Sequence, residues 1–285
     1  MTRQPHVARR AEELLGSAVA ATAPVAGGDI ATATKLRLSS GRSAFMKTLT
    51  NAPEGFFAAE AAGLQWLGEA GGVRVPEVLA VESDCLILAW VEPGKLTTEA
   101  ANDFGRALAK THDAGAPSYG LDRDGFIGRL PLPNKSAPTW ADFYATKRVL
   151  PYLKLARDRG AITPEGAEVI EGLVGRFADL VPEEGPRRLH GDLWNGNVIW
   201  THDGGCCVID PAAHGGHRET DLAMLALFGL PHLPRVLLAY EEVSPLADGW
   251  ADRVGIHQLH PLLVHACLFG GGYGARAAEV AERFS

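Results

Sequence analysis

The most constraining feature of the sequence is the polar segment His190–Asn197, which reads HGDLWNGN and precedes an apolar segment that ends at Asp210. The segment places a carboxylate two residues after its histidine and an amide five residues after that carboxylate. A carboxylate can orient a hydroxyl nucleophile, and amide and carboxylate oxygens are ligands that magnesium accepts beside phosphate and water. The pattern therefore predicts phosphoryl transfer from ATP, with Asp192 as the catalytic residue and with Asn197 and Asp210 as ligands of Mg²⁺.

The loop differs from that of protein kinases at two positions. Its second residue is Gly191, and Asp210 is followed by Pro211. In both respects it resembles aminoglycoside and other small-molecule phosphotransferases. The alternative is a polar hairpin with this spacing by chance, but residue roles and flanking apolar strands agree, which favours the functional interpretation.

The segment before residue 93 predicts a sheet with one helix. Alternating apolar residues and turn chemistry indicate an antiparallel meander that begins with a glycine-containing hairpin. Apolar residues three and four positions apart predict a helix over 53–71. The predicted strands cover 19–28, 30–38, 43–49, 78–81 and 86–91.

After residue 93 the pattern changes to helices, interrupted by two short strands, 198–200 and 206–209, around the polar loop. Glu92, Pro93 and Gly94 form a break that we take as the boundary between an ATP-binding lobe, 1–92, and a catalytic and substrate-binding lobe, 93–285. The predicted fold is therefore α+β, bilobal and protein-kinase-like. The predicted helices cover 98–114, 139–155, 164–180, 220–228 and 250–269.

Two charged residues of the first lobe fit an ATP site. Lys47 lies in the third predicted strand and Glu60 on the helix that follows. In a kinase-like lobe a strand lysine holds the α- and β-phosphates, and a helix glutamate orients that lysine. Either residue alone would be read as a solvated surface charge, but their order before the polar loop favours the functional interpretation.

Two backbone segments complete the predicted ATP site. A turn at Gly27 and Gly28 would let backbone N–H groups approach phosphate, although an ordinary hairpin turn explains it equally well. In the kinase-like plan, adenine contacts the backbone of the connection between the lobes. This connection consists of Ala89, Trp90, Val91 and Glu92.

Beyond the shared loop, the chain resembles the fructosamine (ketosamine) kinases from about Gly28 to Tyr273. Trp194 gives the loop the form H-G-D-L-W-x-G-N that is characteristic of that family. Further similar segments are Asp210-Pro211-Ala212, 216–224, Phe126-Ile127-Gly128, Leu132-Pro133-Asn134, Trp140 with Phe143, 148–151 and 262–273.

The resemblance implies that the chain transfers the ATP γ-phosphate to a sugar hydroxyl of a ketoamine, such as a fructosyl- or ribulosyl-lysine. The 3-phosphate product of such a reaction sheds the amine, which implies deglycation. Trp194 would stack on the sugar chain or attract the cationic amine, unless it is a core residue that supports the loop. We also expect Asn134 to lie near the acceptor.

Two departures from the family pattern stand out. The first hairpin turn has no cysteine, so the redox regulation of some eukaryotic relatives should be absent. Ala213 and His214 stand where the family often has tyrosines, which would alter a nearby wall of the site.

Composition excludes several other classes. The formal net charge of −7 argues against a nucleic-acid partner, which needs clustered positive charge. No window reaches the roughly 18 apolar residues of a spanning helix, and no signal-peptide pattern is present, so we expect a cytoplasmic protein with no membrane partner. The four cysteines have no metal-binding spacing and are expected to be buried. A monomer or weak dimer is expected.

Two other functions remain open from the sequence. One is a small-molecule kinase for aminoglycosides or choline-like amines, and the other is a nucleotide-binding pseudokinase scaffold.

Asp221 is either a helix-terminal acid or a brace for the catalytic loop. His257, His260 and His265 lack a zinc spacing and are expected to lie in the core or to line the site.

Overall fold

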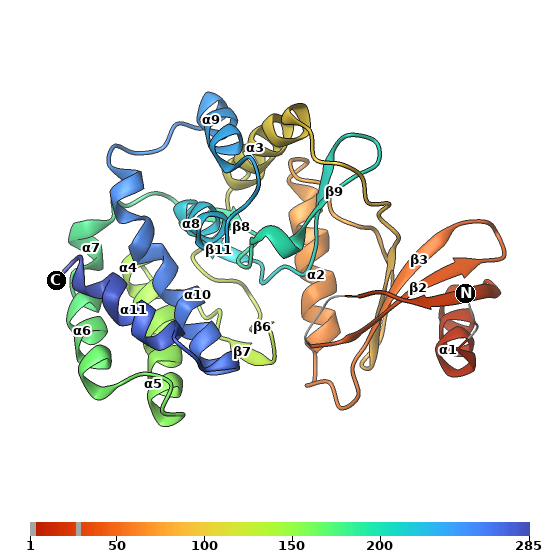
Figure 1. Cartoon of the computed structure of the whole chain (residues 1–285), viewed down its shortest axis with the longest axis horizontal. Coiled ribbons are helices and arrows are strands. Elements are labelled where there is room, and N and C mark those ends of the chain that lie inside the picture. Colours follow the sequence, from red (N-terminus) through yellow and green to blue (C-terminus); the bar gives the residue numbers. More distant parts are fainter. Residues whose placement is uncertain (1–3, 27–29) are drawn as a thin grey trace.

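The computed structural model describes residues 4–26 and 30–285. Its first part is a five-stranded antiparallel sheet with the strand order β1-β2-β3-β5-β4 (Figure 1). All five strands were predicted from the sequence, and each ends within a few residues of the predicted bounds. They are β1 Val19–Pro24, β2 Thr32–Leu38, β3 Ser43–Thr48, β4 Val78–Val81 and β5 Cys85–Ala89.

One helix covers each face of this sheet. Alternate residues of β5 point to opposite faces, so that Cys85 and Ile87 pack toward α1 (Pro5–Leu15), whereas Leu86 and Leu88 pack toward α2 (Phe56–Glu69). The helix α2 confirms the prediction over 53–71. The helix α1 was not predicted, because its arginines and glutamates leave only a short apolar stripe.

The remainder of the chain is mostly helical and lies on the far side of α2 from the sheet (Figure 1). The predicted helix 164–180 is two helices, α6 and α7, and two helices near the C-terminus, α9 and α11, were not predicted. The helices are α3 Thr98–Asp113, α4 Trp140–Phe143, α5 Leu150–Asp158, α6 Pro164–Val174, α7 Phe177–Leu180, α8 Glu219–Leu227, α9 Leu233–Val243, α10 Val254–Phe269 and α11 Tyr273–Glu282. A π-helical turn, Tyr144–Val149, joins α4 to α5, and a 3₁₀ turn, Trp250–Arg253, precedes α10.

Three short strand pairs position the polar loop and the cleft. The loop follows β8 (Arg187–Leu189), which pairs with β11 (His214–Gly216). It leads into the predicted hairpin of β9 (Val198–Trp200) and β10 (Cys206–Val208). A further hairpin was not predicted and consists of β6 (Gly125–Ile127) and β7 (Leu130–Leu132).

The connection between the two parts is held by the β9–β10 hairpin. The Gly94 amide donates to the Trp200 carbonyl at 2.7 Å, and the His202 amide donates to the Glu92 carbonyl at 3.0 Å. The sheet-bearing part and the helical part confirm the protein-kinase-like fold class, and we refer to them as the N-terminal and C-terminal lobes. The boundary between residues 92 and 93 stays a prediction.

Two simpler expectations concern the whole chain. All four cysteines are buried and free, as predicted. Among residues 4–26 and 30–285, no helix combines the length and the apolar character needed to span a membrane.

Candidate active site

The two lobes enclose a cavity of about 1020 Å³. Its lining includes Lys47 and Glu60 from the N-terminal lobe and Asp192, Asn197 and Asp210 from the C-terminal lobe. These five side chains are the predicted catalytic, phosphate-binding and metal-binding residues. The fold therefore brings them together at one place, although they are up to 163 residues apart in the chain.

Lys47 links the two lobes at the bottom of the cavity. Its Nζ donates to both oxygens of Glu60, at 2.8 and 2.9 Å, and to Oδ1 of Asp210 at 3.0 Å. Burial disfavours the charged ammonium, but the two carboxylates outweigh burial and raise the pKa of Lys47. Lys47 therefore carries a positive charge at a point that both lobes reach.

The catalytic loop turns back on itself so that its amide meets its carboxylate. A 3₁₀ turn over Asn195–Asn197 directs Asn197 Nδ2 to the Asp192 carbonyl at 2.8 Å and to Asp192 Oδ2 at 3.3 Å. Burial, reinforced by the charge of Asp210, raises the pKa of Asp192 to about 7. A partly buried carboxylate with this pKa can accept a proton near neutral pH.

Protein kinases have an arginine at the second position of this loop, where this chain has Gly191. A side chain at that position would clash with neighbouring backbone. Gly191 has a φ of +82°, and a Cβ built there would lie 2.1 Å from the carbonyl oxygen of Ala212. No L-residue with a side chain fits that position without a backbone shift. The close packing of the loop against the segment after Asp210 therefore explains why glycine, and not arginine, occupies position 191.

Asp221 braces the catalytic loop from behind. Its two carboxylate oxygens accept the backbone N–H groups of His190 at 2.8 Å and Gly191 at 2.9 Å, and one of them also accepts Nε2–H of His112 at 3.2 Å. Tyr240 donates its hydroxyl to Nδ1 of His112 at 2.8 Å. Burial opposes the charge of Asp221, but these donors outweigh burial and hold its pKa below the usual value. Asp221 is therefore a brace and not merely a helix-terminal acid.

Trp194 lies at the open side of the cavity. It is 38% exposed, and its ring packs over Gly196, where an added Cβ would lie 2.3 Å from the indole. Its other neighbour is Phe228, at an edge-to-face centroid distance of 6.0 Å. The interpretation of Trp194 as a core residue is therefore wrong. Its contact with an acceptor stays a prediction.

Asn134 also lines the cavity, but its side chain is committed elsewhere. Only 1% of it is exposed, its Nδ2 donates to the Arg123 carbonyl at 3.1 Å, and its Oδ1 accepts Nη2 of Arg148 at 2.6 Å. These bonds favour a supporting role behind the wall. A direct contact between Asn134 and an acceptor stays a prediction that these bonds do not favour.

The predicted ATP contacts outside Lys47 and Glu60 have mixed outcomes. Gly27 and Gly28 lie outside the described residues. Ala89, Trp90 and Val91 line the cavity.

Glu92, the fourth residue of the connection, is not among the residues that line the cavity. Its carboxylate accepts Nε1–H of Trp90 at 2.7 Å, and its side chain is 64% exposed. These observations concern the Glu92 side chain, so a contact of its backbone with a nucleotide stays a prediction.

An aromatic wall that the sequence did not predict continues from Trp194. The centroid of His265 lies 4.7 Å from that of Phe228, 5.1 Å from that of Tyr273 and 5.5 Å from that of Phe269. The four-residue spacing of His265 and Phe269 indicates a shared face at the end of α10, whereas Tyr273 begins α11 and is brought to this face by the turn between the two helices. The expectation that His257, His260 and His265 lie in the core or line the site is confirmed, since the first two are buried and His265 lines the cavity.

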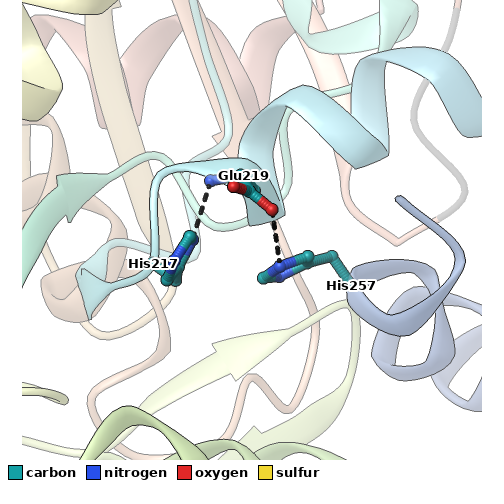
Figure 2. Close-up of side chains that lie close together, drawn as sticks. All are labelled: His217, Glu219 and His257. Carbon is teal, nitrogen blue, oxygen red and sulfur yellow. Dashed lines mark hydrogen bonds and ion pairs between the residues drawn. The ribbon is translucent and has the colours of Figure 1, made fainter. Parts of the chain in front are cut away.

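A second cluster, His217, Glu219 and His257, lies deep in the C-terminal lobe (Figure 2). Nε2 of His257 lies 3.3 Å from Glu219, and the Glu219 amide lies 3.3 Å from Nδ1 of His217. Such a set could hold a metal ion, but the Arg253 guanidinium already binds both Glu219 oxygens, at 2.6 and 2.8 Å. A divalent cation there would face that guanidinium. The cluster is a buried ion-pair network centred on Arg253 and Glu219.

Buried histidines give a pH prediction that can be tested on one residue. Burial lowers the pKa of His214 to about 3, whereas an unfolded histidine titrates near 6.5. Below pH 6.5 the unfolded state therefore binds the extra proton, and the contribution of His214 to stability is lost as pH falls. We expect the stability of the native chain relative to His214→Phe to fall by about 1.4 kcal/mol per pH unit between pH 6 and 4.

Urea unfolding of both proteins at several pH values measures this difference, in which the other titrating groups cancel. A difference that does not change with pH would show that His214 keeps its ordinary pKa in the folded chain.

Comparison with known proteins gives the site its context. The family model described as fructosamine kinase matches residues 3–284. A protein of Enterococcus faecium assigned as a ketoamine kinase is 35% identical over 92% of this chain and 94% of its own length. A chloroplastic protein-ribulosamine 3-kinase of Arabidopsis thaliana is 33% identical over 91% of this chain and 81% of its own. A crystal structure from Thermobifida fusca assigned as a fructosamine-3-kinase is 50% identical, covers 97% of both chains and has a TM-score of 0.92. The chain therefore belongs to the fructosamine kinase family.

Proposed function

We propose that the chain is an ATP-dependent kinase that phosphorylates a sugar hydroxyl of ketoamines. The observation that carries this proposal is the placement of Asp192 beside Asn197, Asp210 and Lys47 in one cavity of a chain that belongs to the fructosamine kinase family. These groups are the parts that phosphoryl transfer requires, because the reaction depends on positioning and charge stabilisation.

The nucleotide occupies the side of the cavity that faces the connection between the lobes. The Ala89 amide is bonded to the Glu77 carbonyl and the Trp90 amide to the Ser43 carbonyl, whereas the Val91 amide makes no hydrogen bond within the described part of the chain. The Val91 N–H is thus available to an adenine ring nitrogen. Lys47, held by Glu60, then lies where the α- and β-phosphates pass.

The donor groups present fit a magnesium ion. Nδ2 of Asn197 faces the Asp192 carbonyl, which leaves the amide oxygen of Asn197 on the other side. Lys47 takes one oxygen of Asp210 and leaves the other. Magnesium prefers such sparse oxygen donors because it keeps phosphate and water as its other ligands. When bound, it would neutralise charge on the transferred phosphate.

The chain's own groups act on the acceptor. Asp192 accepts the proton of the attacking sugar hydroxyl as the oxygen bonds to the γ-phosphorus and the bond to ADP breaks. Trp194 offers an exposed indole face beside Asp192 for the sugar chain and its cationic amine. This activity would lead to deglycation, because the 3-phosphate product loses its amine. We also propose that the protein is cytoplasmic and that it is a monomer or weak dimer.

The other functions considered have less support. An aminoglycoside kinase usually lines its acceptor site with several acids to bind a polycation, whereas this wall is made of Trp194, Phe228, His265, Phe269 and Tyr273. A pseudokinase would lack a part of the constellation, but Lys47, Glu60, Asp192, Asn197 and Asp210 all line the cavity. The family match does not favour either alternative.

The test is an ATP-consumption assay with magnesium against ribulosyl-lysine, fructosyl-lysine, an aminoglycoside and no acceptor. We expect turnover only with the ketoamines, and we expect turnover to stop when magnesium is chelated. The product should carry phosphate on the sugar and release the free amine over time. Turnover of the aminoglycoside alone, or ATP binding without any turnover, would overturn the proposal.

A further inference from the structure

The β6–β7 hairpin is an element of the C-terminal lobe that is bonded to the rest of that lobe through β7 and the residue after it. Nη1 of the fully buried Arg148 donates to the Pro133 carbonyl at 2.6 Å, and the Tyr152 hydroxyl donates to the Pro131 carbonyl at 2.7 Å. Arg148 has no carboxylate within 4 Å among the described residues, and its charge is spread over carbonyl and amide oxygens of this segment. An arginine buried without a counter-ion is costly, so Arg148 depends on these oxygens, and its bonds to Pro133 and Asn134 tie the segment after β7 to the C-terminal lobe.

The same hairpin contacts the other lobe through β6 and through its turn. Phe126 packs into a hydrophobic cluster whose other members all come from residues 30–88 of the N-terminal lobe. Its ring centroid lies 5.2 Å from that of Phe56, the first residue of α2. In addition, Nη2 of the exposed Arg129 donates to the Ile30 carbonyl at 3.1 Å. Figure 1 shows β6 beside α2, between the sheet and the helical lobe.

These contacts reach both halves of the active site. Phe56 lies one helical turn before Glu60 on α2, so the Phe126 contact fixes the turn that holds Lys47. Ile127, the next residue of β6, points to the opposite face of the strand and borders a small cavity that Asp192 also lines. Two successive residues of β6 therefore contact different parts of the site. Phe126 contacts α2, which carries Glu60, and Ile127 borders the cavity beside Asp192.

We propose that the β6–β7 hairpin couples acceptor binding to nucleotide binding, with Phe126 and Arg129 as positioning residues between the lobes. This inference rests on the proposed function, because the acceptor is taken to be a ketoamine. The hairpin lines the cavity with Phe126 and Ile127, so an acceptor that packs against it favours the arrangement of the lobes in which Phe126 contacts Phe56, and that contact holds α2 and thus Glu60 in the geometry that binds phosphate. The coupling is reciprocal, so each ligand tightens the other by the same factor.

The experiment measures ADP affinity with magnesium by calorimetry, with and without a saturating ketoamine. ADP is used because it cannot transfer phosphate. For the unaltered chain we expect the ketoamine to tighten ADP binding by about 5-fold or more. For Phe126→Ala the ratio should fall to within about 2-fold of unity, and Phe126→Leu should restore most of it because leucine still fills the cluster.

Arg129→Ala is the second variant. Because the Arg129 side chain is exposed, its removal should leave the fold intact, so that a lower ratio reports the lost contact. It should lower the same ratio while its thermal midpoint stays that of the unaltered chain. The matched control is Arg157→Ala, which removes an exposed arginine of α5 whose ion pair within residues 4–26 and 30–285 is with Glu171, and it should leave the ratio unchanged.

Each outcome has one meaning. A ratio of unity in the unaltered chain, or an undiminished ratio in folded Phe126→Ala and Arg129→Ala, overturns the coupling. Turnover of the ketoamine by the unaltered chain, recorded on the same preparation, tests the proposed function separately. If no ketoamine is turned over, the proposed function fails and the coupling falls with it.

Discussion

Replacing Asp192 with asparagine is expected to lower kcat for ketoamine phosphorylation by about 10²–10⁴-fold. The amide has the shape of the carboxylate and can still meet Asn197, but it cannot accept the proton of the sugar hydroxyl. Because Lys47, Asp210 and the Val91 amide remain in place, ADP affinity should change by less than about 3-fold. Steady-state kinetics and calorimetry on the same preparation separate these two effects.

The control for this variant is Asp203→Asn, which makes the same change in the exposed turn of the adjacent β9–β10 hairpin. Asp203 pairs with Arg74 outside the cavity. Its replacement should leave kcat unchanged. If Asp192→Asn retained kcat within a few-fold, Asp192 would not be the proton acceptor, and the proposed mechanism would be wrong.

Replacing Asp221 with asparagine is expected to destabilise the chain by about 3–5 kcal/mol and to reduce activity as well. Three donors converge on the Asp221 carboxylate, the N–H groups of His190 and Gly191 and Nε2–H of His112. An amide can accept with only one of its two ends, so at least one buried donor loses its partner. Since two of these donors belong to the catalytic loop, the folded fraction should also turn over more slowly.

Urea unfolding measures the first effect, and kcat of the folded protein measures the second. The matched control is Glu165→Gln, which removes an exposed acid from the first turn of α6 and should cost less than about 1 kcal/mol. If Asp221→Asn cost no more than this control, Asp221 would act as an ordinary helix-terminal acid.

Local pattern predicted the elements that carry the chemistry. The strands β3 and β5 and the helix α2 were predictable because alternation and three- to four-residue spacing reflect which side chains face a core. The helices α9 and α11 were missed. Each packs one apolar stripe against a neighbouring helix, but α9 also exposes Leu238 and Val243, which blurs its stripe, and short connections obscure where one helix ends and the next begins.

The wall of the site was less predictable than its catalytic loop. Trp194 could be found because it lies inside the loop motif, whereas Phe228 comes from the end of α8 and His265 from α10. Nothing local distinguishes these two rings from core residues. The packing of α10 against α8 places His265 against Phe228, which in turn contacts Trp194.

The sequence by itself determined the fold class, and it predicted the catalytic and metal-binding residues, because Asp192, Asn197 and Asp210 lie within 19 residues and are brought together by one hairpin. It also determined the order of Lys47 and Glu60 before them. Tertiary structure alone decided that Lys47 bridges Glu60 to Asp210, that Asp221 and His112 brace the loop, and that Phe126 enters the core of the other lobe. Each of these contacts joins residues from distant elements, and the spacing of residues along the chain carries no information about which distant elements pack together.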